Sequence, residues 1–234
     1  MNAFIHHGTG KQNFTRSMFA HIAPRYDFLN HLLTLGFDRR WRRHLIQQLD
    51  IYSGAQILDL ACGTGDVAKE IISQVQSPRI YGGDPVTEML QIAHRKLPDL
   101  HPVCLEGEHL PFPSGIFDAI TVAFGLRNFA YLETGLGEIY RCLVDGGRIG
   151  FLEFFEPTPG LQGSVFKFYT AHILPAIGGI FSRRYAYRYL PESIEAFGPA
   201  VNFTNLLRQV GFIDIYEQQY LSGLVRIFIG TKAG

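Results

Sequence analysis

The stretch QILDLACGTGDV, residues 56 to 67, constrains the fold of this chain more than any other. It begins with a short apolar run that contains a carboxylate, Asp59, and continues with small residues, among them Gly63 and Gly65. A helical pattern starts directly behind Asp66, a residue type that commonly caps helices. The stretch therefore predicts a strand, a tight turn and a helix, with backbone bare enough for a ligand to lie against it. A turn that needs glycine only for its own geometry is the alternative.

Short apolar runs alternate with helical patterns along the rest of the chain. We expect further strands at 79–84, 102–105, 117–124 and 148–155, helices at about 86–96 and 131–143, and a turn at 145–147. A helix near 203–210 then leads into two strands, 212–220 and 224–232, which should pair antiparallel because only three residues separate them. These elements predict an α/β, Rossmann-like and mostly parallel sheet with helices on both faces and a C-terminal antiparallel pair.

Two regions flank this pattern. Residues 14–35 have helical spacing interrupted at Pro24, and a second helix, 38–49, carries the only tryptophan, Trp41, among four arginines. That helix either packs Trp41 inward behind a solvated face or presents a surface to anionic lipid headgroups. Residues 156–200 are rich in aromatic residues, and an insertion of this length commonly serves as a lid or binding wall. We expect a single domain over 1–234, with 1–50 as a helical extension.

The composition excludes several classes of function. Lys and Arg number 21 and so do Asp and Glu, so no net field would recruit nucleic acid. The three cysteines lack disulfide or zinc spacing, which predicts free thiols and no metal site. The N-terminus has no secretion signal, and the apolar stretch 165–181 is interrupted and short for a membrane span. We expect a cytoplasmic protein that is soluble or peripheral at the membrane.

Carboxylates follow several of the expected strands. Asp59, Asp84 and Glu106 should all meet at the carboxyl edge of the sheet, where such folds bind ligands. Asp84 would reach a ribose diol, although it could instead only cap the next helix. GTGDVA fits a dinucleotide fingerprint as well as an adenosyl-methionine site. Asp59, which could pair with an ammonium group, and the lack of a second nucleotide-binding half favour the methyl donor; a nicotinamide-dependent oxidoreductase is the alternative.

Longer segments carry a family resemblance. These segments are YDFLNHLLTLGFDRRW, ILDLACGTGD, GGDPVTEML, LPFPSGIFDAITVAFGLRNF, YRCLVDGGRIGFLEFFEP and YRYLPESIEAF. They resemble the class I methyltransferases that methylate a ring carbon in ubiquinone and menaquinone biosynthesis, over about residues 19–232. GLRNF and YRYLPESI are the specific segments, because the glycine turn alone would indicate only a methyltransferase. The resemblance implies S-adenosyl-L-methionine as cofactor and a polyprenyl quinol as substrate.

The resemblance also implies which residues hold the methyl donor: Gly63, Thr64, Gly65, Asp84, Glu106, Gly107 and Ala123. This chain departs from the family at three places. It has Cys62 where the family usually has a glycine, Glu106-Gly107 where the family has Asn-Ala, and Asp38 where the family has a histidine. Glutamate accepts a hydrogen bond from an adenine amino group but cannot donate one as asparagine does. We therefore expect the donor affinity or the pocket shape to differ.

The catalytic task is to make a quinol carbon nucleophilic. Ionising a phenol with a pKa of ~10 at pH 7 costs about three pKa units, or roughly 4 kcal/mol, and a fixed cation in a dry pocket could supply much of that. Arg127, beside Asn128 in GLRN, is the candidate, unless it pairs with a neighbouring carboxylate and holds the loop. The resemblance implies that Tyr26 and Asp27 lie on a helical flap over the pocket. Each of these residues could instead be structural.

Further expectations concern partners. The aromatic stretch 165–181 could hold a prenyl tail, with lipid headgroups at Arg39, Arg40, Arg42, Arg43, Arg183 and Arg184. A homodimer is left open. A catalytically idle scaffold for other quinone-pathway proteins is the remaining alternative to an enzyme.

Overall fold

The computed structural model describes residues 8–157 and 184–234, which form one seven-stranded sheet with helices on both faces. The strands are β1 (Gln56–Leu60), β2 (Arg79–Asp84), β3 (His101–Cys104), β4 (Phe117–Ala123), β5 (Leu143–Phe154), β6 (Phe212–Tyr220) and β7 (Val225–Lys232). Their order is β3-β2-β1-β4-β5-β7-β6, and β7 runs antiparallel to both of its neighbours. The predicted fold class and the C-terminal antiparallel pair are confirmed.

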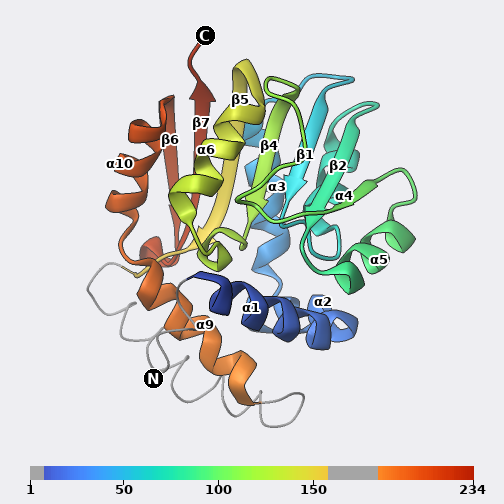
Figure 1. The fold of residues 1–234 in the computed structure, drawn as a ribbon, viewed down its shortest axis with the longest axis vertical. Helices are drawn as coiled ribbons and strands as arrows, with labels where there is room; N and C mark the ends of the chain where they lie inside the picture. The colour runs from blue at the N-terminus through green and yellow to red at the C-terminus, as the bar shows by residue number, and fades with distance from the viewer. Residues whose placement is uncertain (1–7, 158–183) are drawn as a thin grey trace.

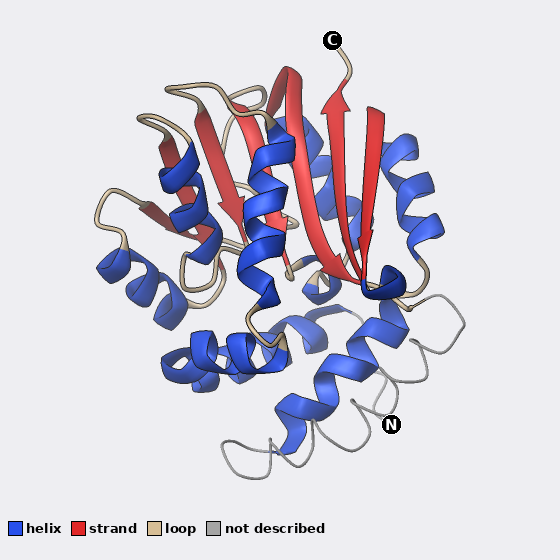
Figure 2. Cartoon of the chain, turned by 180° about the vertical axis from the view of Figure 1, so that it is seen from behind, coloured by secondary structure: helices blue, strands red, loops and turns tan. Residues whose placement is uncertain are grey.

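Apolar helix faces cover the two sides of the sheet. On one side lie α6 (Leu132–Cys142) and α10 (Ala200–Val210), which pack Leu136 and Phe203 into a core with the sheet. On the other side, α3 (Phe37–Leu49), α4 (Asp66–Gln74) and α5 (Thr87–Lys96) build a second core that includes Leu45 and Ile71. Figure 2 shows this second side in front. Because both faces are buried, the central strands are almost continuously apolar, as the sequence indicated.

The predicted helical extension lies along the carboxyl edge of the parallel strands. It consists of α1 (Gly8–Ile22), a 3-10 turn η2 (Ala23–Arg25) and α2 (Tyr26–Leu33), followed by α3. Pro24 lies in η2, so the predicted bend is confirmed. A further helix, α9 (Arg184–Phe197), belongs to the predicted insertion and crosses the same edge (Figure 1). The stretch 165–181 and Arg183 lie outside the described residues, and no helix that is described is long and apolar enough to span a membrane.

Three local predictions need correction. The strand predicted to start at 148 starts at Leu143, because residues 145–147 form a bulge in β5 rather than a turn between elements: the register with β4 jumps from Phe117–Leu143 to Ala119–Arg148. Asp66 is the first residue of α4 and not its cap, since Gly65 occupies the cap position at φ +86°. Helix α10 begins at Ala200, three residues before the position predicted for it.

Candidate functional site

The turn after β1 has an unusual backbone. Ala61, Gly63 and Gly65 all have positive φ, at +55°, +53° and +86°. A side chain on Gly65 would touch Ala93 of α5 at 3.3 Å, so α5 packs directly against the turn. At Gly63, by contrast, an added Cβ would have only the ring of Tyr26 nearby, at 3.7 Å. The glycines therefore serve two needs, close helix packing at Gly65 and bare backbone at Gly63.

Asp84 ends β2, as predicted, and locks this turn. Its Oδ2 accepts a hydrogen bond from the Gly63 amide at 2.9 Å and its Oδ1 one from the Val86 amide at 2.8 Å. Burial raises the pKa of Asp84 to about 6, although the two amides act against the rise. Val86 caps α5, so Asp84 both supports the start of that helix and faces the pocket described below. The two interpretations of Asp84 are compatible.

Asp59 lies beneath the turn. It is fully buried, and it accepts hydrogen bonds from the Thr121 hydroxyl at 3.0 Å and from the Ala68 amide at 3.1 Å. Burial raises the pKa of Asp59 to about 7. Asp59 thus joins β1 to β4 and to the first turn of α4, and it does not line the pocket. Its predicted contact with a donor ammonium group stays a prediction.

A pocket opens at the carboxyl edge, between the sheet and α1. Its empty space is about 720 Å³, counting the opening to solvent. Among the residues predicted for the site, it brings together Tyr26, Gly63, Asp84, Glu106, Gly107, Ala123 and Asn128. The predicted residues Asp27, Asp59, Thr64, Gly65 and Arg127 do not line it. Helix α1 supplies a wall that the sequence did not reveal, made by Gln12, Thr15, Arg16 and Phe19.

Two of the three departures from the family lie at the rim of this pocket or close to it. Arg16 of α1 forms an ion pair with Glu106 at 2.5 Å, and burial raises the pKa of Glu106 while Arg16 opposes the rise. A Cβ on Gly107 would lie 2.3 Å from the Phe129 ring, so the alanine usual in the family would require this ring to shift. Cys62 is buried behind the turn, with its sulfur against Gly82.

Arg127 follows β4 in a 3-10 turn and is buried. Its Nη1 donates to Glu153 Oε1 at 2.5 Å and to the Phe124 carbonyl at 2.9 Å, and its Nε donates to the Ser193 hydroxyl at 3.3 Å. These contacts agree with the alternative interpretation, in which Arg127 pairs with a carboxylate and holds the loop. Asn128 does face the pocket, where its Oδ1 accepts a hydrogen bond from the Tyr189 hydroxyl at 2.8 Å.

The side chains of the flap residues Tyr26 and Asp27 have different surroundings. Tyr26 lines the pocket, and burial raises the pKa of its hydroxyl. Asp27 accepts a short hydrogen bond from the Thr64 hydroxyl and forms a short ion pair with Lys96 of α5. The flap is therefore tied to the glycine turn through Asp27 and Thr64, and Lys96 is a partner that the sequence did not reveal.

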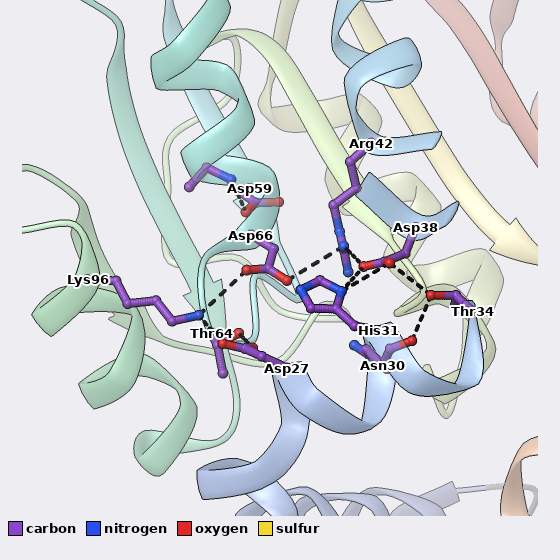
Figure 3. A network of polar contacts seen from close by, with 11 residues as sticks. Asp27, Asn30, His31, Thr34, Asp38, Arg42, Asp59, Thr64, Asp66 and Lys96 are labelled. Atoms are coloured by element: carbon purple, nitrogen blue, oxygen red, sulfur yellow. Dashed lines mark hydrogen bonds and ion pairs between the residues drawn. The ribbon is translucent and has the colours of Figure 1, made fainter. Parts of the chain in front are cut away.

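This tie continues into a network of polar contacts (Figure 3). Lys96 and Arg42 each approach Asp66 at 3.5 Å, and Arg42 forms a short ion pair with Asp38. Asp38 also accepts hydrogen bonds from Thr34 at 2.8 Å and from His31 at 2.9 Å. The network therefore joins α2, α3, α4 and α5 beside the turn.

Asp38 is the third departure from the family, and its surroundings explain how a carboxylate is tolerated there. It is fully buried, which alone would raise its pKa, but Arg42, Thr34 and His31 outweigh burial and lower the pKa. Ligand atoms of His31, Asp38 and Asp66 lie within 4.8 Å of one another, close enough for a metal ion. Arg42 already supplies positive charge to both carboxylates, so the group needs no ion.

The chain's relatives identify the family. The model of the ubiE/COQ5 methyltransferase family matches residues 8–232. The chain belongs to the ubiE/COQ5 methyltransferase family. It is similar to a Geobacter sp. (strain M21) protein named ubiquinone/menaquinone biosynthesis C-methyltransferase UbiE, with 43% identity over 224 residues, 93% of this chain and 95% of the relative. A Thermus thermophilus demethylmenaquinone methyltransferase is 44% identical over 220 residues, 92% of this chain and all of the relative.

Solved structures share the fold of this ubiE/COQ5 family member at low identity. A chain in the complex between the Haloferax volcanii Trm112 methyltransferase activator and a methyltransferase superposes with a TM-score of 0.69 at 16% identity, covering 92% of this chain and 98% of its own. A SAM-dependent methyltransferase from Thermotoga maritima gives 0.67 at 17%, with 93% and 99% covered. The predicted class, a methyltransferase that uses S-adenosyl-L-methionine, is confirmed by the family, which argues against the nicotinamide alternative.

Proposed function

We propose that this enzyme transfers a methyl group from S-adenosyl-L-methionine to a ring carbon of a polyprenyl quinol, in menaquinone biosynthesis, ubiquinone biosynthesis or both. The observation that carries the proposal is the pocket in which Asp84 and Glu106 lie beside the bare backbone of Gly63. The names of the relatives from Geobacter and Thermus support the substrate class.

The lining of the pocket fits the methyl donor. Two carboxylates, Asp84 and Glu106, offer acceptors for hydroxyl and amino groups, and the apolar residues Leu60, Val86 and Phe129 offer walls for a flat ring. Asp84 would hold the ribose hydroxyls, because each of its oxygens has used one acceptor site on a backbone amide and keeps another. The donor supplies a methyl group that already carries its leaving group, so the protein has to align it.

On the quinol side, the residues that face the pocket are Tyr26 and Asn128. We propose that they hold the ring hydroxyl, with Tyr189 fixing the orientation of Asn128. Glu153 neutralises Arg127, which weakens the field of the guanidinium in the pocket. We therefore propose that Arg127 contributes mainly by holding the turn that carries Asn128, and that direct stabilisation of a phenolate is its secondary role.

The function is tested by assaying methyl transfer onto demethylmenaquinol and onto a demethylated ubiquinol precursor. Turnover on at least one of them is expected, and titration calorimetry should show binding of S-adenosyl-L-methionine but not of NAD(H). Donor binding without turnover on either quinol would contradict the proposal and favour the scaffold alternative.

Contact with a membrane belongs to the same proposal, because a polyprenyl quinol resides in a bilayer. Of the arginines expected to meet headgroups, Arg39, Arg40 and Arg43 are exposed, whereas Arg42 is buried in the network. Trp41 is buried too, so it packs inward and does not itself reach a surface. Pairing of two copies stays a prediction.

A further inference from the structure

Two leucines have exposed side chains and a left-handed backbone conformation, which leucine rarely adopts. Leu35, between α2 and α3, is 75% exposed at φ +52°, and Leu221, between β6 and β7, is 52% exposed at φ +49°. A left-handed conformation costs a branched residue about 1–2 kcal/mol, and an exposed leucine gains nothing from burial in return. Such strain is found most often where it serves a function.

A row of aromatic rings, with the buried Trp41 in its middle, connects the segments that carry the two leucines. Phe37, 46% exposed, follows Leu35 closely and stacks on Trp41 with ring centroids 6.1 Å apart. Trp41 in turn contacts the ring of Tyr220 at 6.1 Å, and Tyr220 directly precedes Leu221. Strand β6 runs parallel to β5, so Leu221 lies at the carboxyl edge of the sheet, as the first turn of α3 does (Figure 1). The donor pocket opens at the same edge.

Positive charge flanks these segments. Arg39 and Arg40, two and three residues after Phe37, are exposed, and within the described residues no carboxylate pairs with either. The carboxylate between them and Phe37, Asp38, is buried and bound to Arg42. Glu217 of β6 is bound to Arg226. These segments thus combine apolar side chains with cations that have no counter-ion in the described part of the chain.

We propose that Leu35, Phe37 and Leu221, with Arg39 and Arg40, form a docking surface for a bilayer that contains anionic phospholipids. We name it the leucine tip. Apolar side chains would enter the boundary between headgroups and acyl chains while the arginines meet lipid phosphates. A second copy of the chain fits less well, because a twofold contact would bring the same arginines of both copies together. The inference rests on the proposed function, since the bilayer would present the quinol at the edge where the pocket opens.

The test is co-sedimentation of the full chain with vesicles of phosphatidylcholine containing about 30% phosphatidylglycerol. The variant Leu35→Asn/Leu221→Asn should bind about tenfold more weakly or worse, and it should fold as well as the original because asparagine tolerates the left-handed conformation. Arg39→Gln and Arg40→Gln should each weaken binding about fivefold at low salt. The control is Arg79→Gln/Ile213→Asn, which changes an exposed arginine and an exposed isoleucine at the opposite edge of the sheet.

The outcomes separate the leucine tip from the proposed function. The docking surface is overturned if the original chain fails to sediment with these vesicles, if the leucine variant sediments as the control does, or if the variant only turns a dimer into a monomer. Donor affinity and methylation of a short-chain soluble quinol should be equal in all variants and in the control. Methylation of a long-chain quinol in vesicles should fall in the leucine and arginine variants and stay unchanged in the control. Absence of activity on every quinol, with the binding differences intact, would reject the function and leave the docking surface standing.

Discussion

The pocket has a wall on the sheet side and a wall on the helical side, and different interactions stabilise each of them. On the sheet side, Asp84 fixes the turn through buried hydrogen bonds to the amides of Gly63 and Val86. On the helical side, α1 and α2 pack through small apolar clusters around Ala23 and Leu29, and their polar ties are partly exposed side-chain contacts: Arg16 with Glu106, Lys96 with Asp27, and Lys11 with the Phe129 carbonyl at 2.6 Å. Exposed ion pairs contribute little, typically below about 1 kcal/mol each. The comparison indicates a donor wall fixed by buried hydrogen bonds beneath a cover, made of α1 and α2, whose polar ties contribute little.

The largest expected effect comes from the buried ion pair of Arg42 and Asp38 in α3, to which His31 and Thr34 of the cover are hydrogen-bonded. Arg42→Met leaves the Asp38 carboxylate buried without its main counter-charge, which should lower the free energy of unfolding by about 3–5 kcal/mol. Urea denaturation measures it. The matched control is Arg43→Met in the same helix, whose exposed arginine pairs with Glu70 at 3.2 Å and should cost below about 1 kcal/mol. Similar losses in both variants would contradict the role of the buried ion pair.

Asp84→Ala tests the donor wall. It should weaken S-adenosyl-L-methionine binding about 10- to 150-fold and, because two amides lose their acceptor, also lower the free energy of unfolding by roughly 1–3 kcal/mol. Calorimetry and denaturation give the two values. Asp118→Ala is the control, since Asp118 accepts the Gln56 amide at 2.7 Å at the amino end of β1 and should affect only stability. Unchanged donor affinity in Asp84→Ala would remove Asp84 from the site.

Lowering the pH should change two properties of the donor wall in opposite directions, raising the stability of the fold and weakening donor binding. Because the pKa of Asp84 is raised to about 6 in the folded chain, above about 3.9 in an unfolded one, protonation favours folding. From pH 7 to pH 4 this group should add about 2 kcal/mol to the free energy of unfolding, while donor binding weakens about tenfold per pH unit below 6. The difference between the original chain and Asp84→Asn isolates both effects, and a flat donor affinity between pH 5 and 7 would speak against the assigned role.

The smallest effect is expected at the cover. Lys96→Met removes the cation that Asp27 and Asp66 share, so donor affinity should fall at most about fivefold with little change in stability. Titration calorimetry measures the affinity, and Arg95→Met, one residue earlier on α5, provides the control. A loss as large as that of Asp84→Ala would mean that the cover is as firmly built as the wall.

The same contrast explains what can be predicted from the sequence. Asp84 and the glycine turn can be placed because strand ends and turn residues are local signals. Arg16 and Glu106 are 90 residues apart in the sequence, and Lys96 and Asp27 are 69 residues apart. No local sequence pattern marks such pairs. Arg127 resembles a free cation in the sequence because its partner, Glu153, comes from the neighbouring strand, whose register the sequence does not reveal.

Asp59 has contacts that its position in the sequence does not indicate. Its position before the turn predicts a role toward the ligand, which stays a prediction, and in the structure its carboxylate accepts hydrogen bonds from Thr121 of the adjacent strand and from the start of α4. A strand residue near the end of a run can face either side of the sheet or a helix end, and only the packed neighbours decide which. The helical wall from α1 had no signal beyond the spacing of Gln12, Thr15, Arg16 and Phe19, which any helix face could show.

The Phe129 ring lies between two glycines, and this restricts which substitutions the site can accept in evolution. A Cβ at Gly107 or at Gly135 would lie 2.3 or 2.4 Å from the ring. A larger residue at either position requires the Phe129 ring to move or to be replaced by a smaller side chain. Substitutions at the three positions are therefore coupled, because a change at either glycine has to be accompanied by a change at the ring.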